Sequence, residues 1–248
     1  MRILVINPNT SQSFTDLIDD VLEQYREPET IVAARNPTSG PRSIESVYDE
    51  LLSAQGTLQL FLSEIGNHDG FILACYSDHP AIYAMRELTK KPVIGIAEAS
   101  MLMACMVGHK FSVVTTNDAW QPLLWEAVRH YGLENRCASI RATGLAVLDL
   151  GNHEGQDNYN LIRDAAQSAL GDGAEVICLG CAGMAGLDKR LEEELGVPVI
   201  DGVVSALKFM EGLLKYGLRT SKRRAYTQPM FKALDNLPPE FGLPYKKL

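Results

Sequence analysis

The chain repeats one arrangement of a cysteine and a Pro-Val-Ile segment at the same spacing in its two halves. Cys75 ends the apolar run GFILAC, and Pro92 of KKPVIGI follows 17 residues later. Cys181 follows the apolar run EVICLG, and Pro198 of GVPVIDG again comes 17 residues later. An earlier pair of segments, ILVINPNT and FSVVTT, aligns when the sequence is shifted by 108 residues. Three landmarks in the same order predict two similar structural units.

Short apolar runs alternate with longer amphipathic segments along the chain. The apolar runs are nearly continuous in Val, Ile and Leu, which is typical of parallel strands buried on both faces. They predict strands at residues 3–7, 70–75, 92–96, 111–116, 175–180 and 198–202. Helical periodicity predicts helices near residues 11–25, 45–65, 80–90, 97–107, 119–131, 157–170, 186–195 and 203–216. The alternation predicts an α/β fold with two pseudo-symmetric lobes, parallel sheets and a cleft between the lobes.

The repeat also predicts where the chain divides. We expect an N-terminal α/β lobe at residues 1–105 and a C-terminal α/β lobe at residues 106–216. Whether the last helix of the first lobe is shared with the second lobe, or exchanged into it, stays open. Residues 217–248 hold four prolines and seven Lys or Arg against one Asp and one Glu, without clear periodicity. We expect this tail to pack on the surface of one lobe or of a neighbouring subunit.

Composition and charge argue against several classes of protein. The 248 residues carry a net charge of −8 and contain no long basic stripe, which disfavours nucleic acid and anionic membranes as partners. No apolar run approaches the roughly 20 residues that span a bilayer, and the N-terminal segment lacks the features of a signal peptide. Five cysteines, an odd number, indicate reduced thiols and therefore a cytoplasmic protein.

Cys75 and Cys181 each follow a predicted strand and precede a predicted helix. Ligands of open α/β sheets bind beyond the carboxyl ends of the strands, and a helix N-terminus lowers the pKa of a nearby thiol. Two lobes related by a pseudo-twofold axis would face the two thiols across one cleft. One thiolate can then remove a proton from a carbon while the other thiol delivers a proton to the opposite face. The pair predicts inversion of a stereocentre without a cofactor or a metal.

Polar residues beside the two thiols are candidates for substrate binding. They end the first strand of each half or follow a cysteine, and they are Asn9, Thr10, Ser77, Asp78, Thr115, Thr116 and Gly183. Gly183 in CAGMAG allows close approach to backbone N–H groups, which can stabilise the oxygen of an enolate. None of these loops carries Lys or Arg before its helix begins, which favours a neutral, polar small molecule.

The other cysteines and His79 have simpler interpretations. Cys105 and Cys137 are expected to be structural, because neither has a matching partner in the repeat, and Cys178 is expected to belong to the core because it lies within a predicted strand. The CLGC segment lacks the second ligand pair of a zinc site. His79 has three open roles, which are to tune Cys75, to act as an acid, or to cap a loop. Asp78 has an alternative role as the N-cap of the helix that follows it.

Motifs in a fixed order extend along nearly the whole chain. They are INPNTS, SIESVYDE, ACYSD, PVIGIAEAS, FSVVTT, VICLGCAGM, GVPVIDGV and TSK. Together they resemble the aspartate/glutamate/hydantoin racemase superfamily, and specifically its hydantoin and allantoin racemase branch. The resemblance implies racemisation by Cys75 and Cys181 in a cleft between two α/β lobes, with no cofactor. It also implies a cytosolic homo-oligomer.

The loop after Cys75 departs from that branch. Its members usually read Cys-aromatic-x-Asp-Pro-Gly after the first thiol, whereas this chain reads CYSDHPAIYAMRE. His79 stands where proline is expected, and one extra residue precedes Arg86. The change affects the identity of the substrate more than the type of reaction.

Three hypotheses about function follow. The first is a racemase acting on a cyclic ureide, such as allantoin or a 5-substituted hydantoin. The second keeps the fold and both thiols in an aspartate or glutamate racemase, or in a cofactor-free isomerase or decarboxylase. The third is a protein that binds a ligand without catalysis, and two opposed thiols argue against it because binding alone does not need them.

Overall fold

The structure is a computed structural model that describes residues 1–151, 156–230 and 232–245. Its first half contains β1 (Arg2–Ile6), α1 (Gln12–Tyr25), β2 (Ile31–Arg35), α2 (Val47–Glu64), β3 (Gly70–Leu73), α3 (Pro80–Leu88), β4 (Val93–Gly95) and α4 (Ile96–Val107). Its second half contains β5 (Phe111–Thr115), α5 (Trp120–His130), β6 (Cys137–Ala142), α6 (Gln156–Gly171), β7 (Val176–Leu179), α7 (Asp188–Leu195), β8 (Val199–Ile200) and α8 (Gly202–Tyr216).

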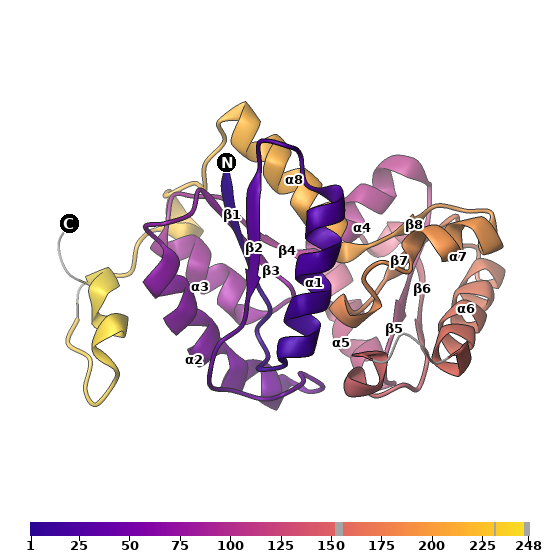
Figure 1. Ribbon diagram of the computed structural model, residues 1–248, viewed down its shortest axis with the longest axis horizontal. Helices are drawn as coiled ribbons and strands as arrows, with labels where there is room; N and C mark the ends of the chain where they lie inside the picture. Colours follow the sequence, from indigo (N-terminus) through magenta and orange to yellow (C-terminus); the bar gives the residue numbers. More distant parts are fainter. Residues whose placement is uncertain (152–155, 231, 246–248) are drawn as a thin grey trace.

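Each half builds one parallel four-stranded sheet (Figure 1). The strand order is β2-β1-β3-β4 in the first sheet and β6-β5-β7-β8 in the second, so one topology occurs twice. Neighbouring strands run parallel throughout both sheets. The predicted α/β fold class with two parallel sheets is confirmed, and the six predicted strands are all present.

The structure adds two strands, β2 and β6, that the sequence analysis does not predict. Both lie at sheet edges, where one side of the strand has no neighbour. In β2 only Val32 is buried, and in β6 only Cys137 and Ile140 are buried. An edge strand with so few buried positions lacks the continuous apolar run by which the inner strands are recognised.

Specific residues begin and end several helices. The Ser46 hydroxyl accepts a hydrogen bond from the Asp49 N–H and caps α2. The Asp201 carboxylate accepts from the N–H groups of Val203 and Val204, at 2.7 and 3.2 Å, and caps α8. Such caps satisfy backbone donors that have no partner within the helix. Gly217 ends α8 with φ of 77°, a left-handed conformation that costs glycine little.

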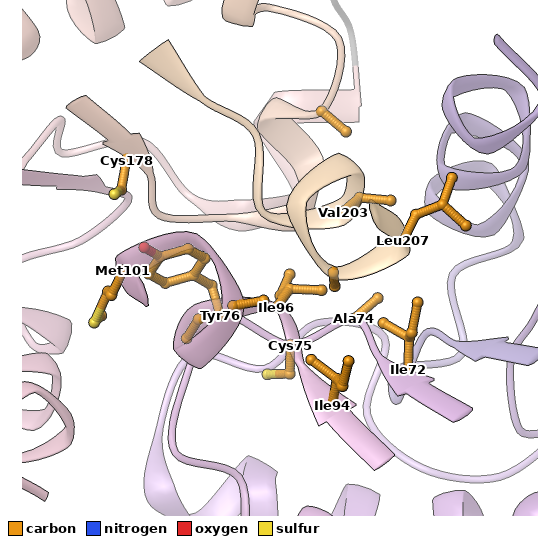
Figure 2. Packing of buried hydrophobic residues seen from close by; sticks show 14 of the residues in the cluster. Ile72, Ala74, Cys75, Tyr76, Ile94, Ile96, Met101, Cys178, Val203 and Leu207 are labelled. Atoms are coloured by element: carbon orange, nitrogen blue, oxygen red, sulfur yellow. The ribbon is translucent and has the colours of Figure 1, made fainter. Parts of the chain in front are cut away.

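One apolar core lies between the two sheets and is shared by both halves. α4 follows the first sheet in the chain and packs against β7 of the second, whereas α8 follows the second sheet and packs against β3 and α1. Figure 2 shows Val203 and Leu207 of α8 over Ile72, with Met101 of α4 and Cys178 of β7 farther along the same core. The exchange of these two helices joins the halves.

The outer face of each sheet has a core of its own. Phe61 of α2 and Met85 of α3 are fully buried against the first sheet, beside Phe71. Ile162 of α6 and Leu191 of α7 are buried against the second sheet. Both faces of both sheets are therefore covered, which explains the continuous apolar runs of the inner strands.

The described part of the tail lies on the first half of the chain, beside α2 and α3 (Figure 1). The Thr220 N–H donates to the Lys90 carbonyl at 2.8 Å, and Lys222 Nζ donates to the Glu87 carbonyl at 2.9 Å. Farther along, Phe241 packs against the outer core of the first sheet. Residues 231 and 246–248 of the predicted tail lie outside the described residues, as do residues 152–155 of the predicted second lobe.

The division into residues 1–105, 106–216 and 217–248 remains our proposal. The first two ranges each contain one of the two sheets, but α4 and α8 each pack on the sheet of the other half. Within the described ranges, no helix combines the length and apolar character needed to cross a membrane.

The exchanged helix α8 should contribute strongly to stability. Leu207 is fully buried in the shared core. We expect Leu207→Ala to lower the free energy of unfolding by about 2–5 kcal/mol, because it leaves a cavity between the two halves. Leu161→Ala, at a leucine that is 45% exposed on α6, is the matched control and should change stability little. Urea denaturation of both variants measures the difference, and equal effects would contradict this account of α8.

Candidate active site

A cavity lies where the carboxyl ends of β1, β3, β5 and β7 meet. Its walls are residues 7–9, 74–76, 115–116 and 180–183, together with Phe14, Ile44, Trp120 and Val147. We call it the thiol cavity because Cys75 and Cys181 both line it. Its volume is about 40 Å³, which is room for a few water molecules at about 10–15 Å³ each. The two central strands of each sheet contribute corresponding segments to this site.

Cys75 follows β3 and is 9% exposed. The Ser77 hydroxyl donates a hydrogen bond to its Sγ at 3.4 Å. In Figure 2 the sulfur of Cys75 points away from Val203 and Leu207 of α8. Burial raises the pKa of the Cys75 thiol; the hydrogen bond from Ser77 opposes this effect, and the negative charges of Glu50 and Cys181 add to it.

Cys181 follows β7 and begins a short 3₁₀ turn, Ala182–Met184. The Gly183 N–H donates to Cys181 Sγ at 3.4 Å. A Cβ atom at position 183 would lie 2.9 Å from the Phe14 ring and 3.1 Å from Leu150, so only glycine fits there without movement. Burial raises the pKa of Cys181 to about 11, although the Gly183 hydrogen bond lowers it.

The expectation that helix N-termini lower the pKa of both thiols is wrong. Desolvation has the larger effect, since a buried thiolate loses its hydration and gains little in return. Among the described residues that line the thiol cavity, none is Lys, Arg or His. Burial therefore favours the protonated form of both thiols, so that forming a thiolate requires a proton acceptor.

Four of the seven predicted binding residues line the thiol cavity, namely Asn9, Thr115, Thr116 and Gly183. The Asn9 side-chain oxygen accepts from Asn7 Nδ2 at 3.0 Å and from the Ser11 N–H at 2.8 Å, which fixes the orientation of the amide. The Thr115 hydroxyl donates to the Gly180 carbonyl at 3.4 Å. These contacts hold the polar wall of the cavity in place.

The other three predicted residues, Thr10, Ser77 and Asp78, do not line the thiol cavity, and Ser77 contacts it only through its hydrogen bond to Cys75. The backbone N–H and the hydroxyl of Thr10 both donate to the Pro41 carbonyl. The Asp78 carboxylate accepts from the Tyr131 hydroxyl at 3.2 Å and also contacts Tyr83 and His130. Asp78 precedes α3, whereas His130 ends α5, so this carboxylate connects the two halves. The predicted role of these three residues in substrate binding remains a prediction.

His79, not Asp78, is the N-cap of α3. Its Nδ1 accepts from the Ala81 N–H at 3.2 Å, and its Nε2 lies 2.9 Å from the Ser53 hydroxyl of α2. The ring is fully buried, and burial lowers its pKa to about 4. Of the three roles left open for His79, the structure supports capping.

The other three cysteines lie away from the thiol cavity. Cys178 Sγ approaches the Ser100 carbonyl at 3.8 Å, and Cys137 Sγ approaches the Ser139 carbonyl at 3.6 Å. All five cysteines are free thiols. In the described ranges, no three His, Cys, Asp or Glu side chains form a group able to hold a metal.

The apolar walls of the site are not predicted from the sequence. Phe14, Trp120 and Val147 enclose the thiol cavity. Phe14 and Trp120 each belong to the first turn of the helix that follows a strand end. That position was a usable signal, because the first turn of a helix faces the ligand side of an α/β sheet. Val147 follows β6, an edge strand that is not predicted, and no local pattern places Val147 at the site.

The sequence profile of the Asp/Glu/Hydantoin racemase family matches residues 3–210. The chain belongs to this family. Hydantoin racemase of Pseudomonas sp. (strain NS671) is 42% identical over 242 residues, which cover 95% of this chain and 96% of the relative. Hydantoin racemase of Rhizobium meliloti is 40% identical over 234 residues, which cover 94% and 97%. These matches confirm the predicted family and its hydantoin racemase branch.

Two solved structures have a similar fold. Allantoin racemase from Klebsiella pneumoniae superposes with a TM-score of 0.91 at 40% identity, covering 95% of this chain and 96% of that chain. Arylmalonate decarboxylase superposes with a TM-score of 0.60 at 18% identity, covering 91% and 97%. The second match shows a shared fold only.

The buried His79 should make stability depend on pH. Its pKa is about 4 in the folded protein and about 6.5 in an unfolded chain. The unfolded state therefore binds more protons between these values, and His79 costs about 3 kcal/mol of stability as pH falls from 7 to 4. Asp201 has the opposite effect on stability. Burial raises its pKa to about 6 in the folded protein, so the folded state binds more protons than the unfolded state as pH falls below 6, and stability rises.

Comparison with His79→Gln isolates the histidine from Asp201. The free energy of unfolding, measured in urea between pH 4 and 7, should favour the wild type most at pH 7. The advantage should shrink steadily toward pH 4. A difference that is constant across this range would contradict the buried, neutral imidazole.

Proposed function

We propose that this protein is a cofactor-independent racemase in which Cys75 and Cys181 transfer protons at a carbon next to a carbonyl group. The observation that carries the proposal is that both thiols line one small cavity, at corresponding strand ends of the two halves. Membership of the racemase family supports the reaction type. The five free cysteines favour a reducing compartment, and we propose the cytoplasm.

The proposed substrate is a cyclic ureide, either allantoin or a 5-substituted hydantoin. Relatives named hydantoin racemase and a structure named allantoin racemase, all at about 40% identity, support this class. The polarity of the cavity walls suits an uncharged ring, because they offer Asn9, Thr115 and Thr116 but no cationic side chain. An amino acid such as aspartate, with two carboxylates, would need positive charge in the cavity walls to replace the hydration of those groups.

Proton transfer proceeds between the two sulfurs through the substrate carbon. The thiolate of one cysteine removes the proton, and the carbanion delocalises onto the neighbouring carbonyl oxygen. Hydrogen bonds from the Asn9 amide N–H and the Thr116 hydroxyl stabilise this oxygen as its charge develops. The other thiol then protonates the opposite face, and the two cysteines exchange their protonation states. The Gly183 N–H stabilises Cys181 when it is the thiolate.

The remaining predicted residues act around this centre. Ser77 hydrogen-bonds to Cys75 and orients its sulfur. Thr10 fixes the loop at Pro41, and Asp78 holds the two halves together. A substrate contact for Thr10 or Asp78 would need the lobes to move when ligand binds.

Other reactions on the same fold are the second candidate. An amino-acid racemase, an isomerase or a decarboxylase would use the same two thiols, and a non-catalytic binder would use neither.

We also propose a homo-oligomer. Four large apolar side chains near the start of α2, Val47, Tyr48, Leu51 and Leu52, are 47–69% exposed and would be covered by a second copy.

Replacing either thiol separately tests the two-base assignment. We expect Cys75→Ser and Cys181→Ser each to lower racemisation by about 10²–10⁴-fold, because each removes one of the two proton carriers. In deuterated water, each variant should still exchange the α-proton of one enantiomer and not of the other. Optical rotation and proton NMR measure the two rates, and loss of carbon dioxide would indicate a decarboxylase.

Cys105→Ser is the matched control, because this half-buried thiol of α4 does not line the thiol cavity. It should racemise at the wild-type rate. If both Cys75→Ser and Cys181→Ser kept full activity, the pair assignment would be wrong. Absence of α-proton exchange with every ureide and amino acid offered would support the binding protein.

The small cavity should limit the side chain of the substrate. Val147 is 7% exposed and lines the thiol cavity. We expect Val147→Ala to raise kcat/KM for a hydantoin with a bulky 5-substituent by about tenfold relative to allantoin, since it makes room for extra carbon atoms. Val203→Ala, a valine of the shared core, should leave this ratio unchanged. Equal ratios in both variants would show that Val147 does not limit substrate size.

A further inference from the structure

The buried carboxyl of Glu50 has no part in the reaction as described so far. It ends the SIESVYDE motif and belongs to the first turn of α2. The residue is 8% exposed, and within the described ranges its Oε1 has no hydrogen-bond partner. A buried carboxyl oxygen without a partner is costly, which makes a structural role a poor explanation.

Ser77 connects Glu50 to the first thiol. Its hydroxyl is buried and donates to Cys75 Sγ at 3.4 Å. Ser77 and Glu50 also line one cavity together, and hydrogen bonding with Ser77 lowers the pKa of the Glu50 carboxyl. Burial acts more strongly and raises the pKa of Glu50. Turning the Ser77 O–H from the sulfur of Cys75 to the carboxylate of Glu50 would connect the two groups through one hydroxyl.

A second cavity reaches Glu50 and Ser77 from the other side. It is lined by Glu50, Ser77 and Trp120, and we call it the side cavity. Its volume is about 340 Å³, large enough for many water molecules, and Asp78, Glu126 and His130 also face it. Trp120 lines both cavities and so stands between the side cavity and the substrate. Water can therefore approach Glu50 while the thiol cavity is occupied.

A two-thiol racemase must exchange protons with water between turnovers. When Cys75 takes the substrate proton and Cys181 gives one, the enzyme ends in the form that accepts the product. To convert a second molecule of the same enantiomer, Cys75 must lose its proton and Cys181 must regain one. Cys75 is buried, so this step needs a route.

We propose that Glu50, acting through the Ser77 hydroxyl, carries the proton of Cys75 to and from water in the side cavity. This assignment rests on the proposed two-thiol racemisation. Glu50 is a positioning and relay residue, because it does not line the thiol cavity and does not touch the substrate.

Each proton that leaves one group in this relay is taken up by the next. The Cys75 S–H proton passes to the Ser77 oxygen while the Ser77 hydroxyl proton passes to the Glu50 carboxylate. The resulting carboxylic acid releases one proton to water in the side cavity. Cys181 takes one proton from water through the thiol cavity after the product leaves. When Cys75 is the acid, each transfer runs in reverse.

The test is Glu50→Gln, which keeps the shape of the side chain and removes its proton transfer. With a single enantiomer, kcat should fall by about 100-fold in both directions. The ratio kcat/KM should stay unchanged, because it reports steps before the resetting of the free enzyme. In a racemic mixture, the rate of isotope exchange between enantiomers should also stay unchanged, since each enantiomer uses the enzyme form that the other leaves.

Additional variants keep the test decisive if Glu50→Gln folds poorly. Ser77→Ala should show the same fall in kcat, and the double variant should be no slower than the slower single variant. Glu50→Asp or added formate should partly restore kcat. Glu211→Gln is the matched control, a buried carboxylate that accepts from the Glu27 N–H at 2.8 Å on the far side of α8.

The outcomes separate this proposal from the one on which it rests. A fall in kcat and kcat/KM together, or an unchanged kcat, overturns the relay. If Cys75→Ser is inactive while Glu50→Gln is like the wild type, the two-thiol reaction stands and only the relay fails. If Cys75→Ser is fully active, both proposals fail.

Discussion

The crossing of α4 and α8 between the halves is the constraint on which the rest of the structure depends. Each helix covers the sheet of the other half, so a single apolar core surrounds the inner faces of both sheets. Closing this core brings together the carboxyl ends of β1, β3, β5 and β7. A sheet that carried its own helices on both faces would leave the two sets of strand ends free to lie apart.

The burial of the two thiols at these strand ends determines their pKa values. Cys75 and Cys181 are enclosed by Phe14, Trp120 and Val147 rather than by cations, and desolvation therefore raises the pKa of both thiols. Neutral thiols in a small, enclosed cavity are poor bases until a proton acceptor is coupled to them. Such a site favours an uncharged ring over an ionic substrate and makes proton exchange with water a separate problem.

Consecutive residues of the loop after Cys75 have different roles. Ser77 donates to the thiol, Asp78 connects the halves through His130 and Tyr131, and His79 caps α3. His79 is also close to Ser53 of α2, the helix that carries Glu50. The departure from the hydantoin racemase pattern at this position thus lies in a buried structural contact, and not in the walls of the thiol cavity.

The sequence alone determined the parallel sheets, the repeat and the strand ends that carry Cys75 and Cys181. These features follow from the local spacing of apolar residues, because inner strands must be apolar on both faces. Only the tertiary structure decided the edge strands, the exchange of α4 and α8, the choice of His79 as the cap, and the place of Glu50 behind Ser77. Each depends on contacts between residues far apart in the chain, which also produce the desolvation that reverses the expected pKa shift of the thiols.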